Sequence, residues 1–200
     1  SNEKLYASLD NNNLIEGYSD IEGNAYGVID FALTSDDKVY VLDTARQEIL
    51  LLENEDIKKT IDYKLDNLNV VDITLDENDV LYTLDRTQNL IAVYDEDNNV
   101  NKYFLKDFKL EAIIDFGAYN SEQLFFVIAN THGSETYIVE LKDCTNEAEI
   151  INKISGRVLD EETVYKTLLV SEEGKDIGRS CIISIFDNLG DEIRTITISS

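Results

Sequence analysis

Short apolar runs alternate with polar turns along most of the chain. In 27–33, apolar residues occupy every second position, so that Ile29, Phe31 and Leu33 share one face. The runs at 39–42 and 49–52 are almost wholly apolar, whereas 57–63 mixes apolar residues with Lys and Asp. Runs of this length and period, bounded by Asp, Asn and Gly, are typical of β-strands. The pattern predicts a four-stranded unit whose last strand is the most polar.

The same pattern returns 42 residues later. The stretch 29–56 aligns without a gap on 71–98, with 7 of 28 positions identical, where chance gives about one or two. The identical pairs are Asp30 and Asp72, Leu33 and Leu75, Asp37 and Asp79, Tyr40 and Tyr82, Leu42 and Leu84, Asp43 and Asp85, and Ile49 and Ile91. The second unit is predicted to have strands at 70–75, 80–84, 90–94 and 102–108.

Two further copies and a partial one extend the array. The third has predicted strands at 112–116, 123–128, 136–141 and 149–154, with Asp115 lying 43 residues after Asp72. The fourth has strands at 164–170, 181–186 and 192–198 and a weakly patterned first strand at 157–159; a short helical turn over 160–165 is the alternative. Runs at 4–9 and 14–18 resemble the last two strands of a preceding copy. The repeats are therefore assigned to 4–18 (half), 27–65, 69–108, 111–154 and 157–198, within one domain over 1–200.

A period near 40 residues that contains four short strands predicts an all-β fold, a β-propeller-like array of four to four and a half antiparallel blades. In a blade the inner strands lie between neighbouring blades and the outermost strand meets water, which fits the polar fourth strand. The aromatic residues at matched positions, such as Tyr40, Tyr82, Phe125 and Tyr165, are expected to pack blade against blade. Because the fourth copy has its own outer strands, an open arc cut from a larger ring is favoured over a closed ring.

The first two copies resemble the NHL-type β-propeller repeat. The resemblance lies in the turn Asp36-Asp37, the second strand Val39-Tyr40-Val41-Leu42-Asp43, Arg46, and the third strand 49–52, echoed at 81–85 and 91–94. It covers two blades well and a third weakly. The chain lacks the Pro before the first strand and the Gly in the first turn that this family carries, so a broader class of six-bladed propellers is an equal alternative.

The charge balance restricts the partners. Lys and Arg number 17 and Asp and Glu number 41, so the net charge is 17 − 41 = −24. Nucleic-acid binding needs clustered cations that displace counterions from phosphates, so we expect no nucleic-acid partner. No run reaches the 18 or so apolar residues of a membrane span, which predicts no membrane insertion within this segment.

The chain contains no Met and no Pro, and Ser1-Asn2 resembles a cleavage scar, so we interpret it as a segment of a larger protein. Two cysteines, Cys144 and Cys181, are too few for a disulfide framework. They are expected to be half-buried thiols, with a single bridge between blades as the alternative.

Repeated carboxylates are the first candidates for chemistry. Asp43 and Asp85 each end a second strand, where a carboxylate can accept backbone N–H groups of the following turn. We expect a structural role for both; an acidic ring for a cation or a basic peptide is the alternative. Asp95, Asp97 and Asn99 have the alternation of a calcium loop but lack its Gly and its later Glu, so a hairpin turn is favoured over a metal site.

Catalytic groups are sparse in this sequence. His132 is the only histidine, no GxSxG motif accompanies it, and no glycine-rich phosphate loop occurs. One loop histidine cannot supply the several His, Asp or Glu residues that propeller hydrolases and lyases gather around a metal. We therefore predict no catalytic residues and no cofactor.

The function expected from these patterns is that of a non-enzymatic binding, sensing or protein-interaction propeller region in a larger extracytoplasmic protein. Ligand contacts are expected on the loops after the second strands and between blades, and the partner is a protein, peptide or glycan. A homodimer through open blade edges is a further expectation. The alternatives are a fragment of a propeller hydrolase or lyase with its catalytic residues elsewhere, and a structural spacer. The candidate ligand residues are Arg46, Gln47, Arg86, Gln88 and His132.

Overall fold

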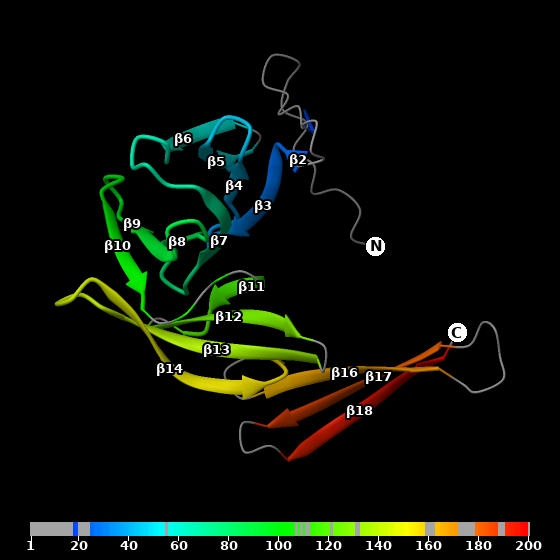
Figure 1. The fold of residues 1–200 in the computed structure, drawn as a ribbon. Coiled ribbons are helices and arrows are strands. Elements are labelled where there is room, and N and C mark those ends of the chain that lie inside the picture. Colours follow the sequence, from blue (N-terminus) through cyan, green and yellow to red (C-terminus); the bar gives the residue numbers. More distant parts are fainter. Residues whose placement is uncertain are drawn as a thin grey trace. The chain divides into compact units, whose positions relative to one another are not determined.

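β-Strands form the secondary structure of the described residues in the computed structural model, and no helix occurs among them (Figure 1). The strands pair antiparallel, except that β10 (Val100–Leu105) and β14 (Glu147–Ser155) pair in parallel. The described residues are 18–19, 25–54, 56–106, 108, 110, 113–120, 122–130, 133–158, 163–171, 179–187 and 191–199. They belong to two compact units: the first comprises Ser1–Leu110 and Leu141–Ala148, the second Glu111–Glu140 and Glu149–Ser200. The predicted strands at 4–9 and 14–18 lie almost wholly outside the described residues; only β1 (Tyr18–Ser19) is described there, and it pairs with β2 (Ala25–Tyr26).

Two four-stranded blades make up most of the first unit. Blade 1 has the order β3 (Val28–Leu33), β4 (Val39–Asp43), β5 (Glu48–Glu53) and β6 (Asp56–Asp62), each strand antiparallel to the next. Blade 2 repeats it with β7 (Val70–Leu75), β8 (Leu81–Asp85), β9 (Leu90–Tyr94) and β10 (Val100–Leu105). The all-β, blade-like fold expected from the 42-residue period is thereby confirmed.

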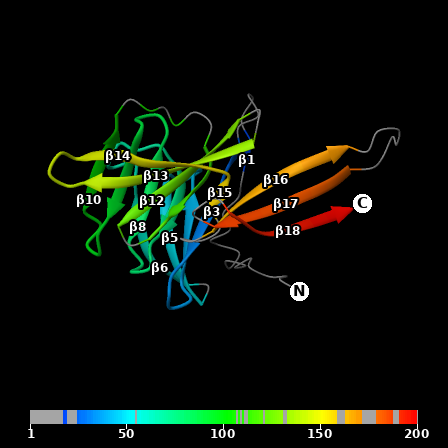
Figure 2. The same cartoon turned by 90° about the horizontal axis from the view of Figure 1, so that it is seen from below.

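The second unit contains the longer strands. Blade 3 is β11 (Ile113–Ala118), β12 (Gln123–Asn130), β13 (Gly133–Lys142) and β14 (Glu147–Ser155), although β13 and β14 each have one end in the first unit. Blade 4 is β15 (Arg157–Val158), β16 (Thr163–Ser171), β17 (Arg179–Asp187) and β18 (Glu192–Ser199), and Figure 2 shows the last three side by side. The alternative of a helical turn over 160–165 is wrong at its C-terminal end, because Thr163 already belongs to β16.

One hydrophobic core joins blade 1 to blade 2. Strand alternation directs Leu42, Ile49 and Ile61 of the first repeat toward the second, where they meet Ile73 and its neighbours. The buried residues of this core are Leu42, Ile49, Ile61, Tyr63, Leu68, Val70, Ile73, Leu81, Leu90, Ala92 and Tyr94. Blade-to-blade packing therefore buries many apolar residues of this unit. A second, smaller core of Val41, Leu50 and Leu52 lies on the other face of blade 1.

The backbone conformation of the turns repeats from blade 1 to blade 2. Among the residues that the structure describes, eight non-glycine residues have positive φ, and seven of these are Asn or Asp, which tolerate this conformation best. They recur at matched turns, for example Asp37 and Asp79 with φ of 65° and 61°. The exception is Gln47, with φ of 61°, whose counterpart 42 residues later is Asn89 with φ of 57°.

A β-bulge also recurs in the first strand of three blades. The pairing with the second strand shifts register between Val28 and Asp30, between Val70 and Asp72, and between Ile113 and Asp115. A bulge inserts one extra residue and re-aims the side chain beside it. The repeated first-strand aspartates thus occupy the same backbone context in each blade; in blade 1, Oδ2 of Asp30 accepts the Ile73 N–H of blade 2 at 2.8 Å.

The outermost strand of blade 1 is exposed, as expected. The innermost strand, which was expected to be buried between blades, is exposed as well. Most of β6 is exposed, as its Lys and Asp residues predict. In β3, however, Phe31 and Leu33 are also exposed. The amphipathic pattern correctly identified one apolar face of β3, but burial of that face requires another sheet opposite it.

Alkaline pH is expected to destabilise the first unit. Burial, with a smaller effect of Asp43, raises the pKa of Tyr63 to about 12, and burial with a hydrogen bond to Asp143 raises that of Tyr103 to about 12. Unfolded tyrosine ionises near pH 10, so the unfolded chain loses these protons first as the pH rises. The stability that the neutral rings contribute is fully present below about pH 10 and is lost between about pH 10 and 12. The β circular dichroism signal should therefore weaken as the pH rises from about 10 to 12, and a signal that stays intact to pH 12 would contradict the expectation.

Candidate functional site

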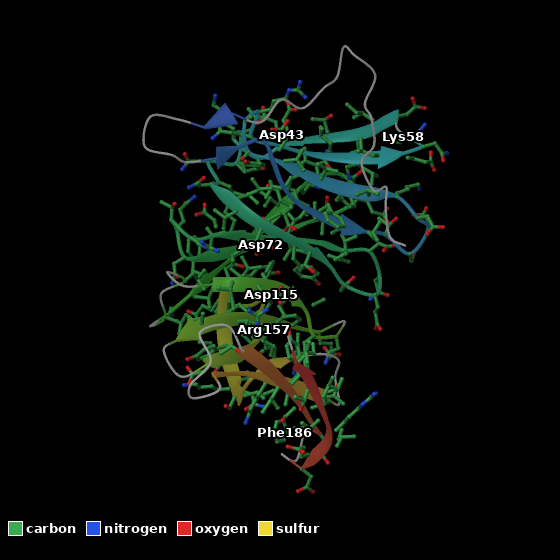
Figure 3. All side chains as sticks on the ribbon, turned by 90° about the vertical axis from the view of Figure 1, so that its right-hand side faces the viewer. Asp43, Lys58, Asp72, Asp115, Arg157 and Phe186 are labelled. Atoms are coloured by element: carbon green, nitrogen blue, oxygen red, sulfur yellow. The ribbon has the colours of Figure 1, made fainter. Side chains whose placement is uncertain are left out.

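Three loops of the first unit lie at one end of its blades. They are the β4–β5 turn (44–47), the β6–β7 connection (63–69) and the β8–β9 turn (86–89), and we call them the loop rim. Their common location follows from the antiparallel order, because every second connection returns to the same end. Figure 3 shows Asp43, beside the rim, and Lys58 toward opposite ends of blade 1.

Asp85 holds two of these loops together from beneath the surface. Its side chain is 0% exposed. Oδ1 accepts the Gln88 N–H at 2.9 Å, and Oδ2 accepts the Asn69 N–H at 2.8 Å and the Gln88 side-chain amide at 2.9 Å. A buried carboxylate with three donors is well compensated for its loss of water. Asp85 therefore fixes the β8–β9 turn against the β6–β7 connection.

Asp43 occupies the equivalent position in blade 1 and is also 0% exposed, but only one of its oxygens is satisfied. Oδ1 accepts the N–H groups of Ala45 at 3.0 Å and Arg46 at 3.2 Å. Oδ2 has no hydrogen bond and lies 3.7 Å from the Arg46 guanidinium. The N–H of Gly27, which corresponds to that of Asn69, instead donates to the Thr44 hydroxyl at 3.2 Å. The two repeats thus share the aspartate but not its second set of donors.

The candidate ligand residues differ in their contacts and in their exposure. Gln88 donates its side-chain amide to Asp85 and to the Asn67 carbonyl, so it stabilises the rim from within. Arg46, at the matching position, pairs with Asp43, yet 44% of its side chain remains exposed. Arg86 is exposed on the β8–β9 turn.

Gln47 is half-buried in its left-handed turn position, and His132 lies outside the described residues.

The rim also contains exposed residues that the repeat pattern did not single out. Leu65 is 84% exposed at the tip of the β6–β7 connection, and the neighbouring Lys64 is exposed as well. Asn69 bridges to the next turn through a 2.9 Å hydrogen bond from its amide to the Thr87 hydroxyl. The β6–β7 connection lies outside the aligned stretches 29–56 and 71–98, so the repeat did not predict that it takes part in the rim. Its length and its composition of Lys, Asp and Asn were the only available clue.

The two ends of the first unit differ in charge. The three rim loops contain Arg46, Lys64 and Arg86 against Asp66, a net charge of 3 − 1 = +2. The turns at 34–38, 76–80 and 95–99 at the opposite end contain one Lys and eight Asp or Glu, a net charge of 1 − 8 = −7. In a chain of net charge −24, the loop rim is therefore a locally basic surface above two buried carboxylates.

The weak calcium candidate lies at the acidic end and forms a hairpin turn. Oδ1 of Asp95 accepts the N–H groups of Asp97 at 2.9 Å and Asn99 at 2.8 Å, and Oδ2 accepts the Asn99 side-chain amide at 2.9 Å. The Asn99 side-chain and backbone donors, more than any other group, lower the pKa of Asp95. Within the part of the chain that the structure describes, no group of three or more His, Cys, Asp or Glu residues is arranged to hold a metal ion.

Cys144 is an exposed free thiol in the turn between β13 and β14, so the expectation of a half-buried thiol is wrong for this residue. The side chain of Cys181 lies outside the described part of the structure. No helix of the described residues is long and apolar enough to cross a membrane.

Comparison with known proteins identifies the fold but no family. No family profile and no curated protein matches the sequence. Among solved structures, the tricorn protease matches with 12% identity and a TM-score of 0.52, over 85% of this chain and 16% of that one. The β-propeller domain of the trilobed protease from Pyrococcus furiosus, which has an open velcro topology, matches with 9% identity and a TM-score of 0.50, over 86% and 56%.

A third solved structure, virginiamycin B lyase from Staphylococcus aureus, matches with 12% identity and a TM-score of 0.46, over 91% of this chain and 61% of that one. The chain thus spans less than two thirds of each of these three structures. Identities this low speak for the fold alone, since one fold serves many functions. The similarity to the tricorn protease and to the trilobed protease domain, together with the strand order, establishes a β-propeller-type chain.

Proposed function

We propose that this chain is a non-enzymatic binding region of a larger extracytoplasmic protein, with NHL-like blades, and that its loop rim contacts the partner. The observation that carries the proposal is that the buried and the exposed residues of the rim have different roles. The repeated residues Asp43 and Asp85 are buried and hold the loops, whereas the non-repeated side chains of Arg46, Leu65 and Arg86 are exposed on top of them. Variable side chains on rigidly held loops are typical of binding surfaces.

The charge and shape of the rim favour an acidic peptide or an acidic glycan as partner. Arg46, Lys64 and Arg86 give the rim its local positive charge, and Leu65 adds an exposed apolar contact. A local patch of sign opposite to the rest of the molecule orients a charged ligand during encounter. The acidic remainder of the chain would repel the same ligand, which restricts binding to this end.

The extracytoplasmic location is supported by the acidic character of the chain. The enzyme alternative takes its support from the protease and lyase neighbours, whose similarity to this chain is one of fold. Both functions allow ligand contacts on loops, so conversion of a bound probe to product would favour the enzyme alternative, and binding without conversion favours the proposal.

The test is binding of a hexaglutamate peptide and of a heparin hexasaccharide, measured by thermal shift and by isothermal titration at low salt, with and without CaCl₂. The variant is Lys64→Ala/Arg86→Ala, which removes two exposed rim cations. Loss of two charge contacts of about 0.7 kcal/mol each is expected to weaken binding of the preferred probe about tenfold. Maltohexaose, a neutral glycan, should cause no shift.

The matched control is Lys38→Ala/Lys58→Ala, which removes the same charge from the acidic end of blade 1. Its affinity for the probe should equal that of the unmodified chain. Equal weakening by both double variants would show a non-specific effect of net charge and would contradict the proposal, as would the absence of binding of either acidic probe. A calcium-dependent melting temperature would favour a metal site instead.

A further inference from the structure

The outermost strand of blade 2 carries an exposed aromatic side chain beside the loop rim. Phe104 lies near the rim end of β10, where it pairs with Leu90, the first residue after the β8–β9 turn. Its side chain is 45% exposed, and the parallel pairing of β14 with β10 at this point leaves it uncovered. In blade 1 the same register position holds Asp62, which pairs with Glu48. A blade of this type therefore does not need an apolar residue here.

Phe104 and Lys102 are on the face of blade 2 that points toward blade 1. Residues two apart in a strand share a face. Lys102 pairs with Ala92 and Phe104 pairs with Leu90, and both partners belong to the core that joins the two blades. The exposed ring of Phe104 therefore lies at the outer border of this core, at its rim end.

The β6–β7 connection reaches the same border and is held there by Asp66. The Lys102 ammonium donates to the Asp66 carbonyl at 2.5 Å, and the Tyr94 hydroxyl donates to Oδ2 of Asp66 at 3.4 Å. Leu65, the residue before Asp66, is 84% exposed. Leu65 is thus one residue, and Phe104 two residues, from the contact between Lys102 and Asp66. An extended peptide, at about 3.4 Å per residue, spans such an interval with about three to five residues.

Cationic side chains accompany the two exposed apolar residues. Lys64 is exposed in the same connection, and Lys102 donates to a carbonyl group, so it keeps its charge. Lys106 follows β10, and 67% of its side chain is exposed although it pairs with Glu147. Together with the net charge of +2 on the rim loops, these lysines make the surface complementary to an acidic partner.

We propose that the loop rim binds an acidic peptide whose apolar side chain docks between Leu65 and Phe104, while acidic side chains on either side of it contact Lys64 and Lys102. This inference rests on the proposed function of the rim and selects the peptide over the glycan. Two separated apolar side chains match an apolar side chain of a peptide, whereas Leu65 offers a sugar ring neither a hydrogen bond nor a π face. The docked side chain anchors the peptide among weaker charge contacts.

Two peptides of equal length and charge, EEELEEE and EEESEEE, test the anchor by isothermal titration at low salt. EEELEEE should bind the unmodified chain about tenfold more tightly, because only its leucine buries apolar surface. Equal affinities would overturn the inference and leave the proposed function intact, since charge alone would then hold the peptide. Binding of the heparin hexasaccharide without binding of either peptide would have the same meaning. Absence of binding by all three probes would contradict the proposed function as well.

The variant Leu65→Ser/Phe104→Thr removes the two apolar contacts of the anchor. EEELEEE should then bind no more tightly than EEESEEE does. The matched control is Ile57→Ser, which removes a 38% exposed side chain from the outermost strand of blade 1 at its acidic end. It should keep the tenfold preference. A preference that survives in the double variant would overturn the inference.

The affinity of the double variant for EEESEEE shows whether the rim is still folded, because this peptide uses the charges alone. It should equal that of the unmodified chain. Loss of affinity for both peptides would mean that Leu65 and Phe104 support the fold of the rim, and would overturn the inference. Weaker binding of the heparin hexasaccharide to the double variant, with EEESEEE unaffected, would place a glycan on these residues and overturn it as well.

Discussion

Replacing Asp85 with alanine is expected to lower the free energy of unfolding by about 4 kcal/mol. The carboxylate is fully buried and receives two backbone N–H groups and one side-chain amide, from Gln88 and Asn69. Its removal takes this partner from three part-buried donors, and a buried donor without a partner costs about 1 to 3 kcal/mol. The turn and the blade connection that Asp85 joins would then separate.

Asp43→Ala is the matched comparison at the equivalent position. Asp43 accepts only the N–H groups of Ala45 and Arg46, and its Oδ2 has no hydrogen bond. We expect about half the loss, about 2 kcal/mol, because fewer buried donors lose a partner. Urea unfolding followed by circular dichroism measures both variants. Equal losses would mean that the additional donors at Asp85 contribute nothing to stability.

Replacing Gly156 with alanine is expected to destabilise the second unit by about 3 kcal/mol. Gly156 has φ of +116°, where a side chain is strained, and a Cβ there would lie 2.8 Å from the Tyr165 carbonyl oxygen. The backbone cannot easily move away. Its N–H donates to the Ser134 carbonyl at 2.9 Å, and its carbonyl accepts the Thr136 hydroxyl at 2.7 Å.

The control for Gly156→Ala is the adjacent Ser155→Ala, since Ser155 is exposed. It should change stability by no more than about 0.5 kcal/mol. Thermal unfolding by circular dichroism compares the two. Equal melting temperatures for the Gly156→Ala and Ser155→Ala chains would show that the backbone at Gly156 shifts freely, which its hydrogen bonds to Ser134 and Thr136 make unexpected.

Local sequence was sufficient to predict the strands and their order. Alternation in 27–33 and the apolar runs that follow it correspond to β3, β4 and β5, and the 42-residue period correctly predicted the second blade. Local conformational preference also explains the turns, because Asp and Asn tolerate positive φ at positions such as Asp37 and Asp79. These properties depend on residues within a few positions of one another.

The candidate site was only partly predictable, because its side chains also depend on residues far away in the sequence. Arg46 and Gln88 occupy the same repeat position, yet one pairs loosely with Asp43 and the other completes the hydrogen bonds of Asp85. The exposure of Leu65 depends on how the β6–β7 connection rises above its neighbours, and the self-match does not extend to it. No local pattern distinguishes these cases.

The sequence by itself determined the class of fold, the strand order and the location of the loops, because strand period and turn preference are local properties. Only the tertiary structure decided which apolar faces are buried, as the contrast between Phe31 and Ile73 shows at one and the same repeat position. It also decided which carboxylate is fully satisfied, as between Asp43 and Asp85. The physical reason is that full burial and full hydrogen-bond satisfaction also depend on what another blade or loop places opposite a residue. Such partners, unlike the neighbouring turn residues, lie 16 to 44 positions away in the chain.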